Sequence, residues 1–155
     1  MLSLRSIQDK MILCRYPIEE ITQLYKKEYE WENIEVGNGN TLLSGIKGDL
    51  FDIEIEFDPA ESDALGFKIH GYDVQYTTKT EKVVSRRTHP MPVMLNNGLI
   101  HLRILVDRTS IEVYCNHGAI TGANCILPIP AGPPPQLYIN GGNASIKSLK
   151  VRELK

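Results

Sequence analysis

Apolar and polar side chains alternate strictly along residues 51–58, where every second position is a carboxylate. The apolar positions are Phe51, Ile53, Ile55 and Phe57. A period of two predicts an antiparallel β-strand with one buried face and one solvated acidic face. Proline lacks the backbone N–H that a strand needs, so Pro59 is expected to end this strand.

Similar short segments, separated by turn residues, predict further strands along most of the chain. They lie at 2–7, 11–16, 65–70, 72–78, 82–86, 99–106, 111–115, 119–127, 136–140 and 144–153. The tripeptide Asn116-His117-Gly118 between two of them is typical of a short hairpin. One helix is predicted at 17–27, because Pro17 suits a first helical turn and apolar residues then recur with helical spacing.

Many short strands and almost no helix predict an all-β fold. We expect two antiparallel sheets stacked as a β-sandwich of the concanavalin or jelly-roll kind, preceded by a short N-terminal strand–helix linker. The linker is assigned to residues 1–30 and the sandwich to residues 31–155.

The composition narrows the classes of function. The chain has 155 residues, 23% of them charged, and a net charge of −2. This balance shows no basic surface for nucleic acid or anionic membranes. No apolar run approaches the roughly 20 residues that cross a bilayer, and the N-terminus lacks the apolar stretch of a secretory signal.

Cysteines and histidines do not predict a metal site, and we expect no cofactor. Cys14, Cys115 and Cys125 include no Cys-x-x-Cys pair. Buried thiols are the simpler interpretation, although a bond between Cys115 and Cys125 on neighbouring strands stays open. The four histidines, which also lack metal-like spacing, are His70, His89, His101 and His117.

Two groups of residues are candidates for a role beyond packing. Asp107 and Arg108 are interpreted as turn residues, since an Asp side chain bonds the local backbone and Arg108 could pair with Glu112. Residues 72–86 combine tyrosines with polar side chains, a combination that binds sugars but also suits ordinary strands. The candidate sugar contacts there are Asp73, Tyr76 and Arg86.

Three segments resemble the C-terminal β-sandwich of glycoside hydrolase family 32, which includes invertases, levanases and inulinases. The segment at 102–114 contains Asp-Arg-Thr-Ser followed by Ile-Glu-Val-Tyr. The segment at 2–21 resembles the end of that family's five-bladed propeller and the linker helix, and the segment at 144–151 resembles its last strand. The resemblance implies that residues 1–30 are a remnant of the propeller end and the linker.

The resemblance also implies that catalysis belongs to the propeller, where two carboxylates about 5 Å apart perform retaining hydrolysis. The motifs that carry those carboxylates in the family are absent from this sequence. Asp58-Pro59 does not replace them, because Phe57 precedes it instead of arginine, and no glutamate precedes any cysteine. We therefore expect no catalysis by the isolated chain.

Two roles follow from the resemblance as hypotheses. The first is a structural module that braces the catalytic propeller and could form homodimers. The second is a carbohydrate-binding module for terminal fructosyl units of levan or inulin. The parent enzyme is expected to be extracellular or periplasmic, although this chain carries no signal peptide. An N-terminal apolar surface is expected to be exposed, formed by Leu2, Leu4, Ile12, Leu13, Ile18 and Ile21.

Overall fold

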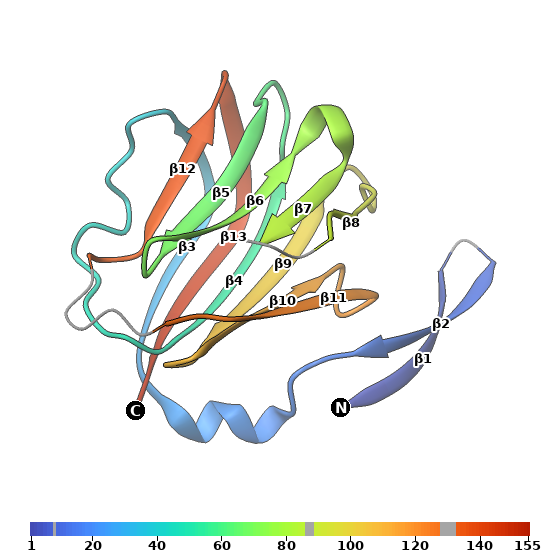
Figure 1. The fold of residues 1–155 in the computed structure, drawn as a ribbon. Helices are drawn as coiled ribbons and strands as arrows, with labels where there is room; N and C mark the ends of the chain where they lie inside the picture. The colour runs from blue at the N-terminus through green and yellow to red at the C-terminus, as the bar shows by residue number, and fades with distance from the viewer. Residues whose placement is uncertain (8, 86–88, 128–132) are drawn as a thin grey trace.

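The computed structural model describes residues 1–7, 9–85, 89–127 and 133–155. It contains thirteen strands and two short 3₁₀ helices among these residues (Figure 1). In chain order they are β1 (Leu2–Ile7), β2 (Lys10–Arg15), η1 (Glu19–Leu24), β3 (Tyr25–Gly37), β4 (Phe51–Asp58), β5 (Ala64–Ile69), β6 (Tyr72–Thr77), η2 (Thr78–Thr80), β7 (Lys82–Ser85), β8 (Met91–Pro92), β9 (Ile100–Val106), β10 (Ser110–Cys115), β11 (Ile120–Cys125), β12 (Gln136–Asn140) and β13 (Asn143–Leu154).

Two antiparallel sheets face each other, which confirms the predicted all-β sandwich. The larger sheet has six strands in the order β11-β10-β9-β4-β13-β3, and the smaller has five in the order β12-β5-β6-β7-β8. The long strands β3, β4 and β13 run through the larger sheet, behind the smaller sheet in the view of Figure 1.

The core lies between the two sheets and follows from the alternation along each strand. The apolar positions of β4 are at most 1% exposed. The smaller sheet contributes Phe67, Val74 and Tyr76, and the ring of Tyr76 meets that of Phe57 edge to face at 5.9 Å. Burial of this many apolar side chains stabilises the sandwich.

The predicted helix over 17–27 is present only in part, and the prediction is wrong for residues 25–27. The chain forms only the short 3₁₀ helix η1, and β3 begins directly after it at Tyr25. Residues 25–37 pair with β13, so residues 25–30 lie in the larger sheet and not in a linker. Long-range pairing overrides the local helical pattern because it satisfies backbone groups along most of β3 at once.

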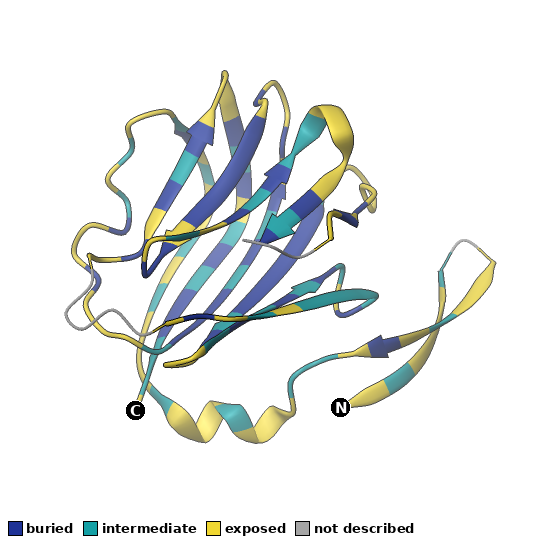
Figure 2. Ribbon diagram, viewed as in Figure 1, coloured by how far each residue is buried: buried dark blue, intermediate teal, exposed yellow. Residues whose placement is uncertain are grey.

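Strands β1 and β2 form a separate two-stranded sheet, the N-terminal hairpin, which extends away from the sandwich (Figure 1). Most of the hairpin and η1 is exposed, as the colours of Figure 2 show. Leu2, Leu4, Leu13 and Ile18 are more than half exposed, as expected from the sequence. Ile12 and Ile21 are half-buried.

The other local predictions concern turns and cysteines. The hairpin around Asn116-His117-Gly118 joins β10 to β11, as predicted. Cys115 and Cys125 lie near opposite ends of that hairpin, because Cys115 pairs with Ile120 and Cys125 pairs with Ser110. No disulfide joins them. None of the helices in the described residues is long and apolar enough to span a membrane.

Candidate functional site: a polar clamp and an apolar hairpin

The outward face of the larger sheet carries a cluster of charged side chains. The predicted solvated acidic face of β4 is wrong for Asp52, which is 0% exposed. Register explains the clustering, because Asp52 pairs with Arg152 on β13 and Glu54 pairs with Arg103 on β9. Opposite charges placed directly across neighbouring strands attract each other.

Asp52 and Arg103 form a buried ion pair with two hydrogen bonds. Arg103 Nε donates to Asp52 Oδ1 at 2.9 Å, and Arg103 Nη2 donates to Oδ2 at 2.6 Å. Although burial opposes the charge of Arg103, the hydrogen bonds and charge of Asp52 raise the pKa of the guanidinium above its usual value. A bidentate pair of this kind fixes both geometry and charge.

Glu54 is the second carboxylate of the cluster and receives several donors. His101 Nε2 lies 3.1 Å from Glu54 Oε1, the hydroxyl of Tyr16 donates to the same oxygen at 2.9 Å, and Arg152 donates to Oε2 at 3.2 Å. The hydrogen bond from His101, followed by that from Tyr16, holds the pKa of Glu54 well below its usual value despite burial. Glu54 is therefore a stable anion.

Two tyrosines fasten η1 to these carboxylates. Tyr16 lies just before η1 and donates to Glu54, whereas Tyr25 begins β3 just after η1 and donates to Asp52 Oδ2 at 2.7 Å. Arg103 contacts both, with its guanidinium 5.1 Å from the ring centre of Tyr16 and Nη2 3.2 Å from the Tyr25 hydroxyl. We call Tyr16, Tyr25, Asp52, Glu54 and Arg103 the tyrosine clamp.

The clamp changes the acidity of its own hydroxyl groups. Burial, with the hydrogen bond to Asp52, raises the pKa of Tyr25 to about 12. Burial and the charge of Glu54 raise the pKa of Tyr16 still further from its ordinary value. Both tyrosines are therefore neutral hydrogen-bond donors at physiological pH, so the contacts with the carboxylates persist.

A second set of contacts joins the end of β2 to the turn after β10. The backbone N–H of Arg15 donates to Gly118 O at 3.0 Å, and Arg15 Nη2 donates to Thr121 Oγ1 at 2.6 Å. A Cβ at Gly118 would lie 1.9 Å from Arg15 O, so only glycine fits there. The imidazole of His117 in the same turn stacks on His101 at 3.7 Å.

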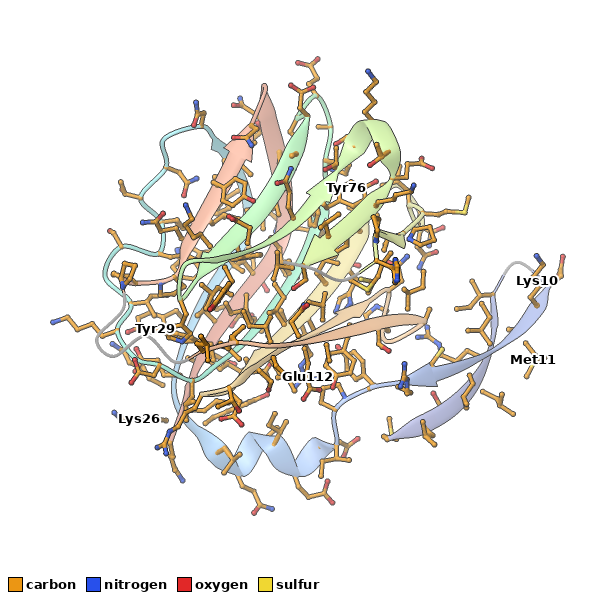
Figure 3. The ribbon with its side chains drawn as sticks, viewed as in Figure 1. Lys10, Met11, Lys26, Tyr29, Tyr76 and Glu112 are labelled. Carbon is orange, nitrogen blue, oxygen red and sulfur yellow. The ribbon has the colours of Figure 1, made fainter. Side chains whose placement is uncertain are left out.

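The anchored N-terminal hairpin turns an apolar face to solvent. Register places Leu4 opposite Leu13, with Leu2 and Met11 on the same face. These four side chains, which we call the hairpin face, are 58–67% exposed. Figure 3 shows Met11 near the far end of the hairpin, away from both sheets. The opposite face includes Cys14, which is 1% exposed.

The predicted sugar contacts do not form one site. Asp73 is exposed, but Tyr76 is 1% exposed and belongs to the hydrophobic core. Tyr76 is therefore a core residue, and its choice as a surface contact is wrong because residues 73 and 76 lie on opposite faces of β6. Arg86 lies outside the described residues.

A tyrosine that the sequence reading missed lies beside Asp73. Tyr138 on β12 donates its hydroxyl to Gln75 Oε1 at 3.2 Å, on the outward face of the smaller sheet. Burial raises the pKa of Tyr138, and the neighbouring charge of Asp73 raises it further. The signal in the sequence was the alternation in β12, which places Leu137 and Ile139 inward and Tyr138 outward.

Asp107 lies in the turn between β9 and β10, where Asp107 Oδ1 accepts a hydrogen bond from the backbone N–H of Arg108 at 2.7 Å. The carboxylate of Glu112, the expected partner of Arg108, accepts a hydrogen bond from the hydroxyl of Tyr114.

Across the described ranges no group of three or more His, Cys, Asp or Glu side chains has a metal-binding arrangement.

A family of known domains matches nearly the whole sandwich. The family model described as the C terminal of glycosyl hydrolases family 32 matches residues 20–153. A levanase of Bacillus subtilis (strain 168) is 26% identical over 99% of this chain, which corresponds to 26% of the levanase. A levanbiose-producing levanase of the same organism is 29% identical over 90% of this chain and 31% of its own length.

Solved structures agree on the fold. The exo-inulinase of Aspergillus awamori superposes with a TM-score of 0.79 at 19% identity, over 99% of this chain and 34% of the inulinase chain. The fructan 1-exohydrolase IIa of Cichorium intybus superposes with a TM-score of 0.74 at 17% identity, over 99% of this chain and 40% of that chain. The superposed region includes nearly all of this chain, hairpin and η1 included.

Proposed function

The chain belongs to the C-terminal domain family of family 32 glycosyl hydrolases, and from this membership we propose that it is a non-catalytic module that braces the catalytic domain of a fructan- or sucrose-hydrolysing enzyme. The chain spans about a quarter of the length of the first levanase it matches. The single observation that carries the proposal is an exposed apolar hairpin face on a segment that hydrogen bonds anchor to the sandwich.

The hairpin face has the properties of a docking surface. Contiguous exposed apolar side chains on an otherwise polar surface mark interaction sites. The tyrosine clamp and the Arg15–Gly118 hydrogen bond restrain the segment that carries this face. A restrained apolar surface loses less conformational entropy on docking than a loose one, so it suits a permanent intramolecular contact.

The occupant we assign to the hairpin face is the catalytic domain of the same polypeptide. The levanases that match this chain are about three to five times longer, and their remaining length accommodates such a domain. A contact made within one polypeptide has a high effective concentration, so a small apolar face is sufficient. Hydrolysis belongs to that domain, and the proposal assigns none to this chain.

The test is a fusion of residues 1–155 to a family 32 catalytic domain that lacks its own C-terminal module. We expect the fusion to withstand a higher temperature before losing half of its sucrose- or levan-hydrolysing activity than the catalytic domain alone. Leu4→Glu with Leu13→Glu should remove this gain, because charges would then face the apolar partner surface. The isolated chain should release no reducing sugar from sucrose, levan or inulin.

The matched control is Leu127→Glu, since Leu127 is 73% exposed and lies outside the hairpin. This variant should keep the full gain in thermal resistance. Equal thermal resistance of the fusion and the catalytic domain alone would contradict the brace. Loss of the gain in Leu127→Glu would show that the effect does not come from the hairpin face. Sedimentation would reveal whether the hairpin face pairs two copies of the isolated chain instead.

Fructan binding is a second proposed function, supported by the pairing of Tyr138 with Gln75 beside Asp73. The half-buried Tyr138 has amide and carboxylate groups at its edge, and the exposed part of its ring offers a sugar an apolar surface beside hydrogen-bonding groups. Calorimetry with levan and inulin tests this function. Saturable heat supports binding, and no heat at millimolar sugar contradicts it.

A further inference from the structure

Tyr138 occupies a cross-strand row on the outward face of the smaller sheet. Register places Tyr138 opposite Gly66, Gly66 opposite Gln75, and Gln75 opposite Val84. A Cβ at Gly66 would lie 2.5 Å from both Cζ and the hydroxyl oxygen of Tyr138. The missing side chain at Gly66 therefore lets the tyrosine side chain lie across β5 and reach Gln75 on β6.

Two hollows lie near this tyrosine, one lined by Tyr138 and the other by its hydrogen-bond partner Gln75. The first, of about 360 Å³, lies between the chain that follows β3 and the start of β12, and Tyr138 is part of its wall. The second, of about 280 Å³, is lined by Asp73, Gln75 and Val84. Because Tyr138 bonds Gln75, the Tyr138 side chain bridges the two hollows. Together they form what we call the Tyr138 groove.

The chemistry of the first hollow suits a neutral polyhydroxylated ligand. Its lining contains amides and hydroxyls from Asn38, Thr41, Ser44 and Gln136, with apolar surface from Pro134 and Pro135. None of the described residues that line it is charged. Amide and hydroxyl groups both donate and accept hydrogen bonds, as sugar hydroxyls do, whereas a charged ligand would lack a counter-charge.

The second hollow differs because it offers a carboxylate. Asp73 lies beside Lys68 across β5 and β6, so its charge has a cationic neighbour. A carboxylate accepts hydrogen bonds from sugar hydroxyls, and such charge-assisted bonds are the stronger ones. The hollows differ in character and are linked by the hydrogen bond between Tyr138 and Gln75, an arrangement that fits successive residues of one sugar chain.

We propose that the Tyr138 groove binds several consecutive residues of a neutral oligosaccharide, which crosses the Tyr138 side chain from one hollow to the other. This inference rests on the second proposed function and is independent of the brace. Each hollow alone is at or just below the lower end of the roughly 300–1,000 Å³ typical of ligand pockets. Binding should therefore require both, and affinity should rise with the length of the sugar.

The experiment is calorimetry of the full chain with fructose, 1-kestose, fructosylnystose and inulin, and with maltohexaose as a differently linked neutral sugar. We expect at least a tenfold gain in affinity from fructose to fructosylnystose. Tyr138→Ala should weaken fructosylnystose binding about tenfold or more. Tyr138→Phe, which keeps the ring and loses the hydrogen bond to Gln75, should weaken it only a few-fold.

Further variants test the two hollows separately. Gln136→Ala alters the first hollow and Gln75→Ala alters the second. Each variant should reduce the gain in affinity with increasing sugar length, while fructose still binds at the other hollow. Gln23→Ala is the control, because Gln23 is exposed in η1 on a different part of the surface. Circular dichroism of every variant shows whether the sandwich is intact. If a variant is unfolded, sugar binding by Tyr138→Phe becomes the deciding measurement.

The outcomes distinguish a failure of the extended groove from a failure of fructan binding itself. Equal affinity for fructose and fructosylnystose, with binding lost in Asp73→Ala but kept in Tyr138→Ala, overturns the extended groove and leaves fructan binding standing. Absence of heat with every sugar overturns both. Length-dependent binding of maltohexaose as well as fructosylnystose supports the groove, with a specificity for neutral chains broader than fructans.

Discussion

Tyr16 donates its hydroxyl group to Glu54 at 2.9 Å, across 38 residues of sequence. The contact joins the segment between β2 and η1 to the middle of β4, a central strand of the larger sheet. Together with the bond from Tyr25 to Asp52, it fixes both ends of η1 on one face. The orientation of the N-terminal hairpin thus depends on two phenolic hydroxyls and two carboxylates.

Tyr16→Phe should loosen the N-terminal segment while the sandwich remains folded. The variant keeps the ring and removes one hydrogen bond to a charged acceptor, which contributes about 1.5–3 kcal/mol. Urea unfolding should show a loss in that range, and amides of residues 1–24 should exchange faster with deuterium. Tyr29→Phe is the control, because it loses its bond to Glu153 near the C-terminus and should leave exchange in residues 1–24 unchanged.

Arg103→Met should be among the most destabilising changes on this face. It would leave Asp52 with no exposed surface and without its bidentate partner. Removing one member of a buried ion pair costs about 3–5 kcal/mol in free energy of unfolding. The double variant Asp52→Leu with Arg103→Met should be more stable than Arg103→Met alone. If the losses in free energy of unfolding are additive in this double-mutant cycle, Asp52 and Arg103 do not stabilise the protein as an interacting pair.

The stability of the protein should fall below about pH 4.5 partly because of Glu54. In the folded protein the hydrogen bond from His101, then that from Tyr16, depresses the pKa of Glu54 below its ordinary value of 4.5. Between the two pKa values the unfolded chain binds a proton that the folded chain does not. This contribution is therefore complete above the ordinary pKa and is lost as the pH falls through the folded pKa.

Glu54→Gln should accordingly flatten the acid limb of the stability curve, measured by urea unfolding from about pH 6 to about pH 3. The variant should be less stable than the parent at pH 6, and the difference should shrink towards pH 3. Glu35→Gln, at an exposed carboxylate of β3, should leave the acid limb unchanged. Parallel curves for Glu54→Gln and the parent would show that Glu54 does not contribute to acid unfolding.

The sequence predicts the strands and the sandwich well because alternation is a local property. The strict period of β4 predicts which side chains face the core, and the structure agrees at Phe51, Ile53, Ile55 and Phe57. It does not predict the burial of Asp52. That burial depends on Tyr25 and Arg103, which contact Asp52 from segments far apart in the chain.

The error over residues 17–27 has the same cause, whereas the error at Tyr76 does not. The apolar spacing of residues 17–27 favours a helix locally, but pairing of β3 with β13, more than a hundred residues away, decides the structure after Leu24. Alternation along β6 was enough to place Tyr76 in the core with Val74. The approach of Tyr138 to Gly66 could not be predicted from local alternation, because it requires the pairing of β12 with β5.

Gly118→Ala tests whether the turn after β10 holds the N-terminal hairpin in place. Gly118 has φ of +82°, and an added Cβ would lie 1.9 Å from Arg15 O. Gly98 is a matched control, with φ of +81° and no atom within 4 Å of an added Cβ. Alanine at either position incurs the backbone strain of positive φ, about 1–2 kcal/mol. Only Gly118→Ala must also displace β2, since the clash is with backbone.

Limited trypsin digestion separates the two effects, because the hairpin offers cleavage sites at Arg5, Lys10 and Arg15. Gly118→Ala should be cut there several times faster than the parent, and Gly98→Ala at nearly the parental rate despite a similar loss of global stability. Faster cleavage arises because displacement of β2 breaks the bond from Arg15 to Gly118 O and uncovers Cys14. Equal cleavage of the two variants would mean that the tyrosine clamp alone orients the hairpin. In the fusion enzyme, Gly118→Ala should then also lower the gain in thermal resistance, because a displaced hairpin face no longer meets the catalytic domain at the required angle.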